Sequence, residues 1–260
     1  MVRRNLRNSF PDKSETELLE YEHQFYHQFC SVIVEIVYSY RMSIDEVKQR
    51  VRFNGLEQLI ELNQRYGGSF VMLGHVGCWE WMASIHHHIK DSGITECSVY
   101  RRLKQKPMDE LMQEIRCRIG GICSEKNQIL RTIISRKKDN LPTLYGMLSD
   151  QKPSPQNMHF WTTFLNQDTS FLNGTEVLAR KYRLPVFFFD ITQPQRGYYD
   201  VTIHLIAEQP ELTDEYRITA DYAALLEDNI RLQPHLWLWS HNRWKWQRKD
   251  IPANIKTNIT

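Results

Sequence analysis

Hydrophobic residues in the first part of the chain have the spacing of an α-helix. Between residues 14 and 40 they recur every three or four positions, which places them on one helical face. Ser14 and Glu17 have the spacing of a capping box, so we expect the helix to begin there. A second, shorter helix is expected over residues 56–65, ending at Gly67-Gly68.

From residue 69 onward, short apolar runs alternate with amphipathic stretches. The apolar runs predict strands over residues 69–73, 95–100, 141–148, 185–190 and 199–206. The amphipathic stretches predict helices over residues 79–90, 107–119, 128–138, 174–182 and 214–231. Residues 152–167, rich in proline and aromatic side chains, are expected to form a loop. The alternation predicts an α/β fold with a central, mostly parallel sheet flanked by helices.

No stretch of the sequence has the composition of a linker, so we expect effectively one domain. An N-terminal helical segment, residues 1–66, should pack on an α/β core of residues 67–250. Residues 251–260 should form a C-terminal tail.

Composition and charge exclude several classes of protein. Charged residues make up 25% of the chain and apolar residues 41%, which is typical of a globular protein. The 33 Lys and Arg residues nearly balance the 31 Asp and Glu residues, which argues against a nucleic-acid partner. The five cysteines include no C-x-x-C pair, so neither a disulfide framework nor a zinc knuckle is expected. No apolar run reaches the ~18 residues of a membrane span, so we expect a soluble or peripheral protein.

His75 and Glu80 form the strongest candidate site, where the buried strand 69–73 gives way to a helix. Two helical residues five apart are separated by ~140° around the axis, so His75 must lie in the loop for the two to meet. Glu80 could then accept a hydrogen bond from one imidazole nitrogen and leave the other as a base. An alternative of equal weight is that His75 caps the helix and Glu80 is a solvated acid of its first turn.

The segment Gly-His-x-Gly-x-Trp-Glu at residues 74–80 resembles the H-x4-D/E block of the lysophospholipid acyltransferase superfamily. It is most similar to the bacterial lipid A biosynthesis acyltransferases of the lauroyl/myristoyl type. Further segments resemble that family's blocks in the same order: residues 5–11, 100–103, 120–121, 148–151, 172–179 and 238–245. Cys78, Arg102 and Asn242 depart from the family's pattern. The family also begins with an apolar anchoring helix, which the resemblance does not include.

The resemblance implies a glycerolipid-acyltransferase-like fold and acyl transfer from a thioester of acyl carrier protein or CoA. The acceptor would be a hydroxyl of a lipid A-like glycolipid or other membrane lipid, at the cytoplasmic face of the bacterial inner membrane. The acyl thioester would be a cosubstrate, with no bound cofactor and no metal.

Carried over by position, His75 would be the general base and Glu80 would orient it. Arg101 would bind phosphate or another anionic headgroup, and Asp150 would be a supporting polar residue. A tetrahedral oxyanion would need hydrogen-bond donors, for which we consider backbone amides near Gly77.

Other functions remain open at this stage. The same His and Glu could activate water in a thioesterase or hydrolase, or the chain could bind a lipid or a carrier without catalysis. Cys78, beside the proposed base, could form an acyl-enzyme, although direct attack by the acceptor needs no covalent step.

Four further patterns allow two interpretations each. Arg101, Arg102, Lys104 and Lys106 form a basic cluster that could bind phosphate or serve solubility. The consecutive histidines 86–88 fan out around a helix, which argues against one metal site. Tryptophans 237, 239, 244 and 246 among basic residues suit a membrane interface or a core. The apolar segment 160–165 could line an acyl groove, but core packing is favoured.

Overall fold

A seven-stranded sheet forms the centre of the protein in this computed structural model, which describes residues 1–252, 255 and 257–259. The strand order is β1-β9-β8-β2-β5-β3-β4. The strands are β1 (Val51–Asn54), β2 (Ser69–Leu73), β3 (Thr95–Tyr100), β4 (Ile122–Glu125), β5 (Thr143–Leu148), β8 (Val186–Gln195) and β9 (Tyr198–Ala207). Every neighbouring pair is parallel except β8 and β9. The predicted α/β fold with a mostly parallel sheet is confirmed.

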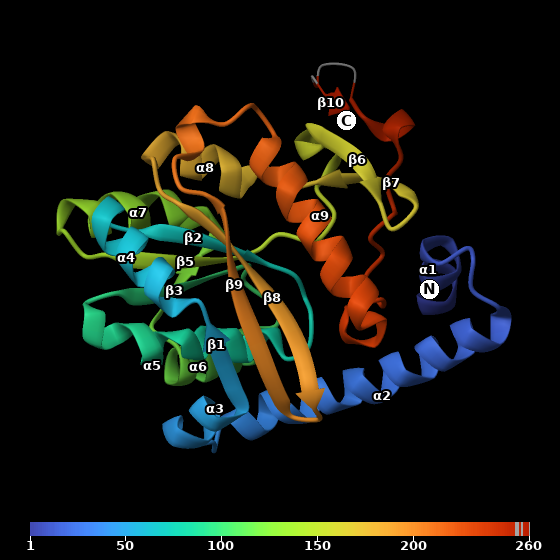
Figure 1. Cartoon of the computed structure of the whole chain (residues 1–260), viewed down its shortest axis with the longest axis horizontal. Helices are drawn as coiled ribbons and strands as arrows, with labels where there is room; N and C mark the ends of the chain where they lie inside the picture. Colours follow the sequence, from blue (N-terminus) through green and yellow to red (C-terminus); the bar gives the residue numbers. More distant parts are fainter. Residues whose placement is uncertain (253–254, 256, 260) are drawn as a thin grey trace.

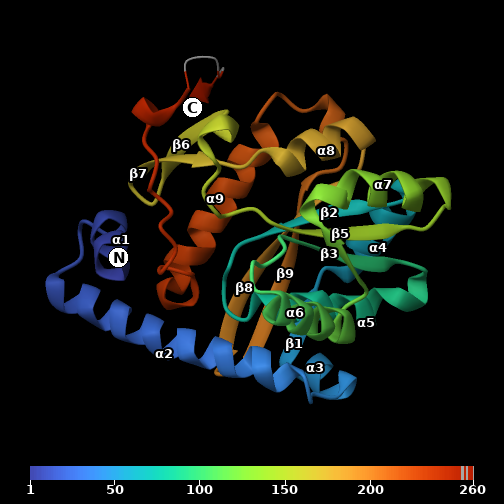
Figure 2. The same ribbon diagram turned by 180° about the vertical axis from the view of Figure 1, so that it is seen from behind.

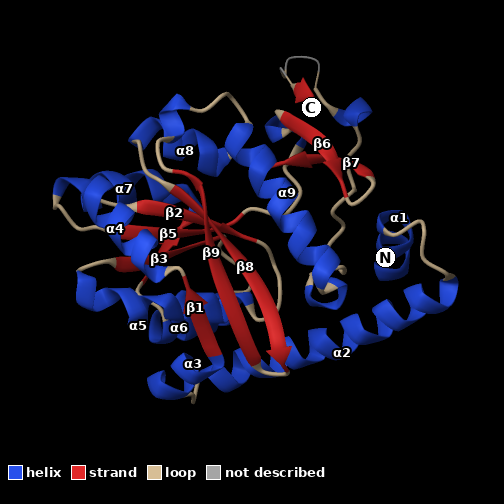
Figure 3. Cartoon of the chain, viewed as in Figure 1, coloured by secondary structure: helices blue, strands red, loops and turns tan. Residues whose placement is uncertain are grey.

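Helices cover both faces of this sheet. They are α1 (Val2–Ser9), α2 (Glu15–Ser39), α3 (Ile44–Arg50), α4 (Leu56–Tyr66), α5 (His86–Ile89), α6 (Lys106–Ile119), α7 (Ile129–Lys138), α8 (Gly174–Tyr182) and α9 (Arg217–Leu232). Helices α4 and α7 lie on one side of the sheet, and α5 and α6 lie on the other (Figures 1 and 3). Within the described ranges, no helix is both long and apolar enough to cross a bilayer.

Strand β2 lies in the middle of the hydrophobic core. All five of its residues are buried, as expected for a strand covered on both faces. Burial of a large apolar side chain such as Phe70 or Met72 contributes about 1.5–3 kcal/mol. The core therefore fixes the position of the loop that follows β2.

Helix α2 begins as the sequence predicts, with a complete capping box between Ser14 and Glu17. The helix runs past the free end of the β8–β9 hairpin (Figure 1). Glu35 of α2 is buried there, and the Tyr199 hydroxyl donates to its carboxylate at 2.7 Å. Helix α1 joins the start of the chain to its C-terminal segment. The two segments lie side by side in Figure 2. The side chain of Asn5 donates to the carbonyls of Trp239 and His241 at 2.9 and 3.1 Å.

Residues 152–167 are not a continuous loop, which corrects the sequence-based expectation. Strand β6 (Phe160–Phe164) pairs antiparallel with β7 (Gln167–Phe171), and β10 (Asn258–Ile259) extends this second sheet. The tight turn places Leu165 and Asn166 at φ of 49° and 59°. Hairpin turns of this kind usually contain glycine, so this one lacks its usual sequence signal.

The expected helix over residues 79–90 is divided into three short pieces. A 3₁₀ helix, η1 (Trp79–Ile85), precedes α5, and another 3₁₀ turn, η2 (Lys90–Ser92), follows it. Residues 80–85 are all buried, so contacts on several sides, and not one apolar helical face, determine the backbone conformation here. The short elements α1, α3, β1 and β4 were also not predicted, because each offers too few residues for a periodic pattern.

Candidate active site

Two ionisable residues follow the ends of neighbouring strands. His75 lies two residues beyond β2, and Asp150 lies two residues beyond β5. The two strands are parallel, and Leu73 is in register with Leu148. The carboxyl ends of parallel strands lie at one edge of a sheet, where α/β proteins place their ligands. The register therefore brings His75 and Asp150 together.

The Asp150 carboxylate holds His75 through both its backbone and its ring. Nδ1 of His75 lies 2.6 Å from Oδ1 of Asp150, and the His75 backbone N–H donates to Oδ2 at 2.9 Å. The indole N–H of Trp237 donates to the same Oδ2 at 2.9 Å. Since an ionised carboxylate only accepts hydrogen bonds, the ring proton of neutral His75 lies on Nδ1 and leaves Nε2 as the acceptor.

The other ring nitrogen of His75, Nε2, lies next to the side chain of Gln151. The side-chain amide of exposed Gln151 lies 3.3 Å from this atom and can donate to it. The ring of Trp79 packs edge-on against the imidazole, with centroids 5.0 Å apart. The imidazole is thus held by Asp150 through Nδ1, and its Nε2 lies beside an exposed side chain.

Burial and charge act in opposite directions on the His75–Asp150 pair. Burial lowers the pKa of His75, but the Asp150 carboxylate outweighs it, so the pKa of His75 is raised above 6.5. Burial alone would raise the pKa of Asp150, yet the charge and hydrogen bonds of His75 lower that pKa to about 2. At neutral pH Asp150 is therefore an anion, and it favours a proton on the imidazole.

Glu80 binds a different partner from the one expected. Its two carboxylate oxygens each lie 2.6 Å from a guanidinium nitrogen of Arg116 on α6, and both side chains are largely buried. No hydrogen bond joins Glu80 to His75 among the described residues, which corrects the expected orienting contact. The Glu80 charge still contributes to the raised pKa of His75. Asp150 takes the orienting position because strand register places it there, and α6 brings Arg116 to Glu80.

The backbone amide of Gly77 is already occupied. It donates to the carbonyl of Leu236 at 3.0 Å, so among the backbone amides near Gly77 this one is already paired. Gly77 has a φ of 54°, and a Cβ there would lie 2.5 Å from a ring carbon of Tyr199. Glycine is therefore required by both the backbone and the neighbouring ring.

Arg101 follows β3, on the far side of β5 from β2. Its side chain is exposed and forms no ion pair within the described part of the chain. The adjacent Arg102 pairs with Glu125 at 3.2 Å, so the basic cluster is not uniformly solvated. Arg101 thus lies at the same edge of the sheet as His75 with its charge uncompensated.

The side chain of Cys78 is fully buried, whereas a nucleophilic cysteine is normally accessible to its substrate. Burial raises the pKa of its thiol, and the charges of Glu35 and Glu80 act in the same direction. A thiolate is strongly disfavoured in this position, which argues against an acyl-enzyme on Cys78.

The remaining sequence patterns divide between core and surface. Trp237 and Trp239 are buried in the core, as are the apolar residues of segment 160–165. Trp244 donates its indole N–H to Thr169 at 2.8 Å and, with Trp246, lines a small pocket. Within the described chain, no three metal-binding side chains gather into a site, and burial lowers the pKa of His87.

Fold and site together define an α/β protein with an imidazole–carboxylate pair at the carboxyl edge of its sheet. The family model for bacterial lipid A biosynthesis acyltransferases matches residues 1–246, so the chain belongs to that family. Membership implies an acyltransferase with a lipid acceptor. A search of curated proteins found no significant match.

The sequence did not predict the contacts of three side chains of this site, those of Asp150, Arg116 and Trp237. The position of Asp150 two residues after strand 141–148, like that of His75 after strand 69–73, was a signal for their proximity. Arg116 and Trp237 gave no such signal, because each reaches the site from a distant segment.

Proposed function

We propose that this protein transfers a fatty acyl chain from a thioester of acyl carrier protein or CoA to a hydroxyl of a lipid A precursor or related glycolipid. The observation that carries the proposal is the 2.6 Å contact between Nδ1 of His75 and Asp150, which leaves Nε2 as a base. A base of this kind suits deprotonation of an acceptor hydroxyl.

The proposed reaction needs no covalent enzyme intermediate. The acceptor oxygen attacks the thioester carbonyl as its proton passes to Nε2 of His75. The new C–O bond is then complete, the C–S bond breaks, and the leaving thiolate takes the proton from the imidazolium. Asp150 stabilises the imidazolium that exists between the two proton transfers.

We assign a supporting role to Glu80. Its ion pair with Arg116 joins η1 to α6 and keeps a negative charge near the imidazole. Because η1 directly follows the loop that carries His75, this pair helps to fix that loop, and each of the two buried charges has a partner.

Two further assignments concern the membrane substrate. We propose that Arg101 binds a phosphate or other anionic group of a lipid, because its guanidinium is exposed at the edge of the sheet that carries His75. The acceptor is a membrane lipid, so we place the reaction at the surface of the inner membrane on its cytoplasmic side.

The proposal is tested by incubating the purified chain with radiolabelled acyl–acyl carrier protein or acyl-CoA and a lipid A precursor. We expect a labelled acyl-lipid, and its formation should fall by about 10²–10⁴-fold in His75→Ala. His23→Ala, which removes an exposed histidine from α2, is the matched control and should retain activity. Release of free fatty acid without acceptor dependence would instead identify a thioesterase, and transfer that survives His75→Ala would exclude the assigned base.

A further inference from the structure

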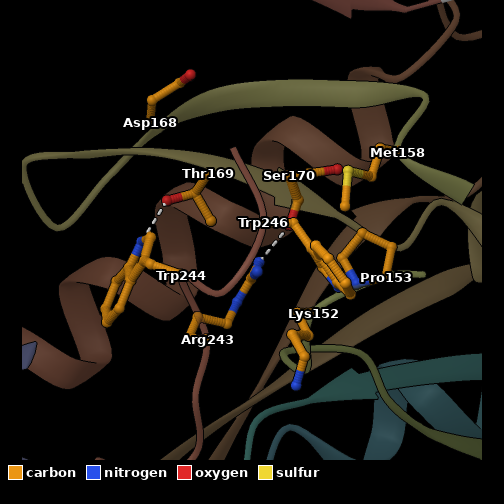
Figure 4. Close-up of a pocket in the computed structure, with 9 residues that line it drawn as sticks. All are labelled: Lys152, Pro153, Met158, Asp168, Thr169, Ser170, Arg243, Trp244 and Trp246. Carbon is orange, nitrogen blue, oxygen red and sulfur yellow. Dashed lines mark hydrogen bonds between the residues drawn. The ribbon is translucent and has the colours of Figure 1, made fainter. Parts of the chain in front are cut away.

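A small pocket adjoins the proposed active site. It lies between the segment that follows Asp150, the β6–β7 hairpin and the C-terminal segment (Figure 4). The residues that line it are Lys152, Pro153, Met158, Asp168, Thr169, Ser170, Arg243, Trp244 and Trp246. The backbone N–H of Lys152 lies 3.4 Å from Nε2 of His241, which joins the two segments just beyond Asp150.

Arg243 is an unusual residue in this pocket because its guanidinium is buried. Only 3% of Arg243 is exposed. One guanidinium nitrogen donates to the carbonyl of Ser170 at 2.5 Å, and the ring of Phe171 lies 4.6 Å from the guanidinium carbon. Nε of Arg243 and Oγ of Ser170 are buried without a hydrogen-bond partner among the described residues. Buried polar groups normally form hydrogen bonds, so both atoms are available to a polar group that enters the pocket.

The positive charge of the pocket has no counter-charge within it. Asp168 is the one acid in the lining, but it pairs with Arg248 at 2.5 and 2.6 Å, and its carboxylate points away from Arg243 (Figure 4). Neither Lys152 nor Arg243 forms an ion pair with any described residue. A buried charge without a partner is costly, which favours an anion in this place.

The pKa values of the cations reflect this lack of compensation. Burial lowers the pKa of Arg243 to about 10, although the Asp150 carboxylate opposes the shift. Burial also lowers the pKa of Lys152, and the charges of Lys245 and Arg243 lower it further. Lys152, which lines the pocket, follows Asp150 by two residues, and this places the pocket near the proposed base.

We propose that Lys152 and Arg243 bind a phosphate group of a substrate, at a subsite distinct from Arg101. The pocket has a volume of about 10 Å³, which holds about one water-sized group. One phosphate oxygen can enter beside Arg243 and Ser170, while the remainder stays at the mouth near Lys152. The guanidinium offers planar donors suited to phosphate, and the ammonium adds a point charge.

This subsite rests on the proposed function, under which the phosphate can have two sources. One is the headgroup of a phosphorylated glycolipid acceptor, and the other is the phosphodiester that links a carrier to its acyl thioester. Kinetic comparison separates them. In Lys152→Ala, kcat/KM should fall by about 10–100-fold for a phosphorylated acceptor and stay unchanged for its dephosphorylated form if the acceptor is the source. If the donor is the source, the loss should occur with acyl-CoA and disappear with a short acyl thioester that lacks phosphate.

Direct binding of inorganic phosphate tests the subsite without turnover, by ³¹P NMR titration of the full chain. We expect saturable binding that weakens at least tenfold in Lys152→Ala and in Arg243→Gln, with Lys249→Ala, an exposed lysine outside the pocket, as control. Thermal unfolding of each variant identifies any loss caused by misfolding, and Lys152 is the less buried of the two. Absence of binding, or equal binding by wild type and a folded Lys152→Ala, would overturn the subsite. Phosphate binding in a protein without acyl transfer would instead overturn the proposed function alone.

Discussion

Nδ1 of His75 and Oδ1 of Asp150 lie 2.6 Å apart, although 75 positions separate them in the sequence. The second carboxylate of the site, Glu80, is bound by Arg116 and not by the imidazole. The two acids therefore have separate partners: Asp150 fixes the imidazole of His75, and Glu80 compensates a buried guanidinium. This division leads to distinct expectations for substitutions at the two positions.

Asp150→Asn should reduce turnover more than Glu80→Gln. An amide cannot stabilise the imidazolium and can favour the wrong tautomer, so we expect a loss in kcat of about 10³–10⁴-fold for Asp150→Asn. Glu80→Gln keeps a hydrogen-bonding group opposite Arg116 and should lose much less. Steady-state kinetics with one acyl donor measures both. The reverse order of effects would mean that Glu80 orients the base during the reaction.

The pH dependence of the reaction should follow His75. Because Asp150 raises the pKa of His75 above 6.5, kcat/KM should increase with pH through that raised value as the imidazole loses its proton. In Asp150→Asn burial is the largest remaining influence and the Glu80 charge opposes it only in part, so the midpoint should move below 6.5. NMR titration of the imidazole checks both values directly. A midpoint that is unchanged by the substitution would contradict the assignment.

The same pKa shifts determine how the pair contributes to stability. The His75 contribution is complete below pH 6.5 and is lost as pH rises through its raised pKa. The Asp150 contribution is present above pH 3.8 and is lost as pH falls through about 2. Urea unfolding of wild type and Asp150→Asn across this range should give curves that converge at low pH. If the difference in unfolding free energy between the two proteins were the same at every pH, the ionisation of this pair would not contribute to stability.

Arg116→Ala should destabilise the fold by about 3–5 kcal/mol, because it leaves the Glu80 carboxylate buried without its partner. Removal of both side chains in Glu80→Ala/Arg116→Ala should cost less than the sum of the two single substitutions. Arg65→Ala, which removes exposed ion pairs with Glu61 and Glu208, serves as control and should change stability little. If the losses in unfolding free energy from the substitutions at positions 80 and 116 were additive, the two side chains would not stabilise each other.

Gly77→Ala should destabilise the protein through both its backbone and its neighbour. The residue has a φ of 54°, and the added methyl group would lie 2.5 Å from the Tyr199 ring. Gly93→Ala is the matched control, since Gly93 also has positive φ but no atom within 4 Å of an added Cβ. Both substitutions should lower the free energy of unfolding by about 1–2 kcal/mol through the backbone. The contact with the Tyr199 ring should add about 1–3 kcal/mol for Gly77→Ala. Equal midpoints of thermal unfolding would show that the ring moves away freely.

Cys78→Ser should retain acyl transfer, because the buried thiol has a raised pKa and no role in the proposed steps. Intact-protein mass spectrometry after incubation with acyl donor alone should show no acyl adduct on the wild-type chain. A stable adduct that disappears in Cys78→Ser would restore the acyl-enzyme route.

The sequence predicted the larger elements of the fold well. The capping box of α2 and the buried run of β2 are local patterns, and both appear in the structure as expected. The β6–β7 hairpin was missed because its turn at Leu165 and Asn166 carries no glycine, and its strands are stabilised by packing against residues remote in sequence. Local pattern therefore succeeded where a periodic face or an uninterrupted apolar run stands out, and failed over residues 79–90 and at the β6–β7 hairpin, where contacts with distant segments set the backbone.

For the site, the sequence by itself determined that an imidazole follows a buried strand, and that ordered motifs resemble one family. It could not determine which carboxylate holds His75, because Glu80 is near in sequence whereas Asp150 is near only through the register of β2 with β5. Nor could it determine that Arg116 neutralises Glu80, or that Arg243 is buried beside Lys152. Periodicity depends on neighbouring residues, but charge pairing depends on which distant segments the folded sheet and helices bring together.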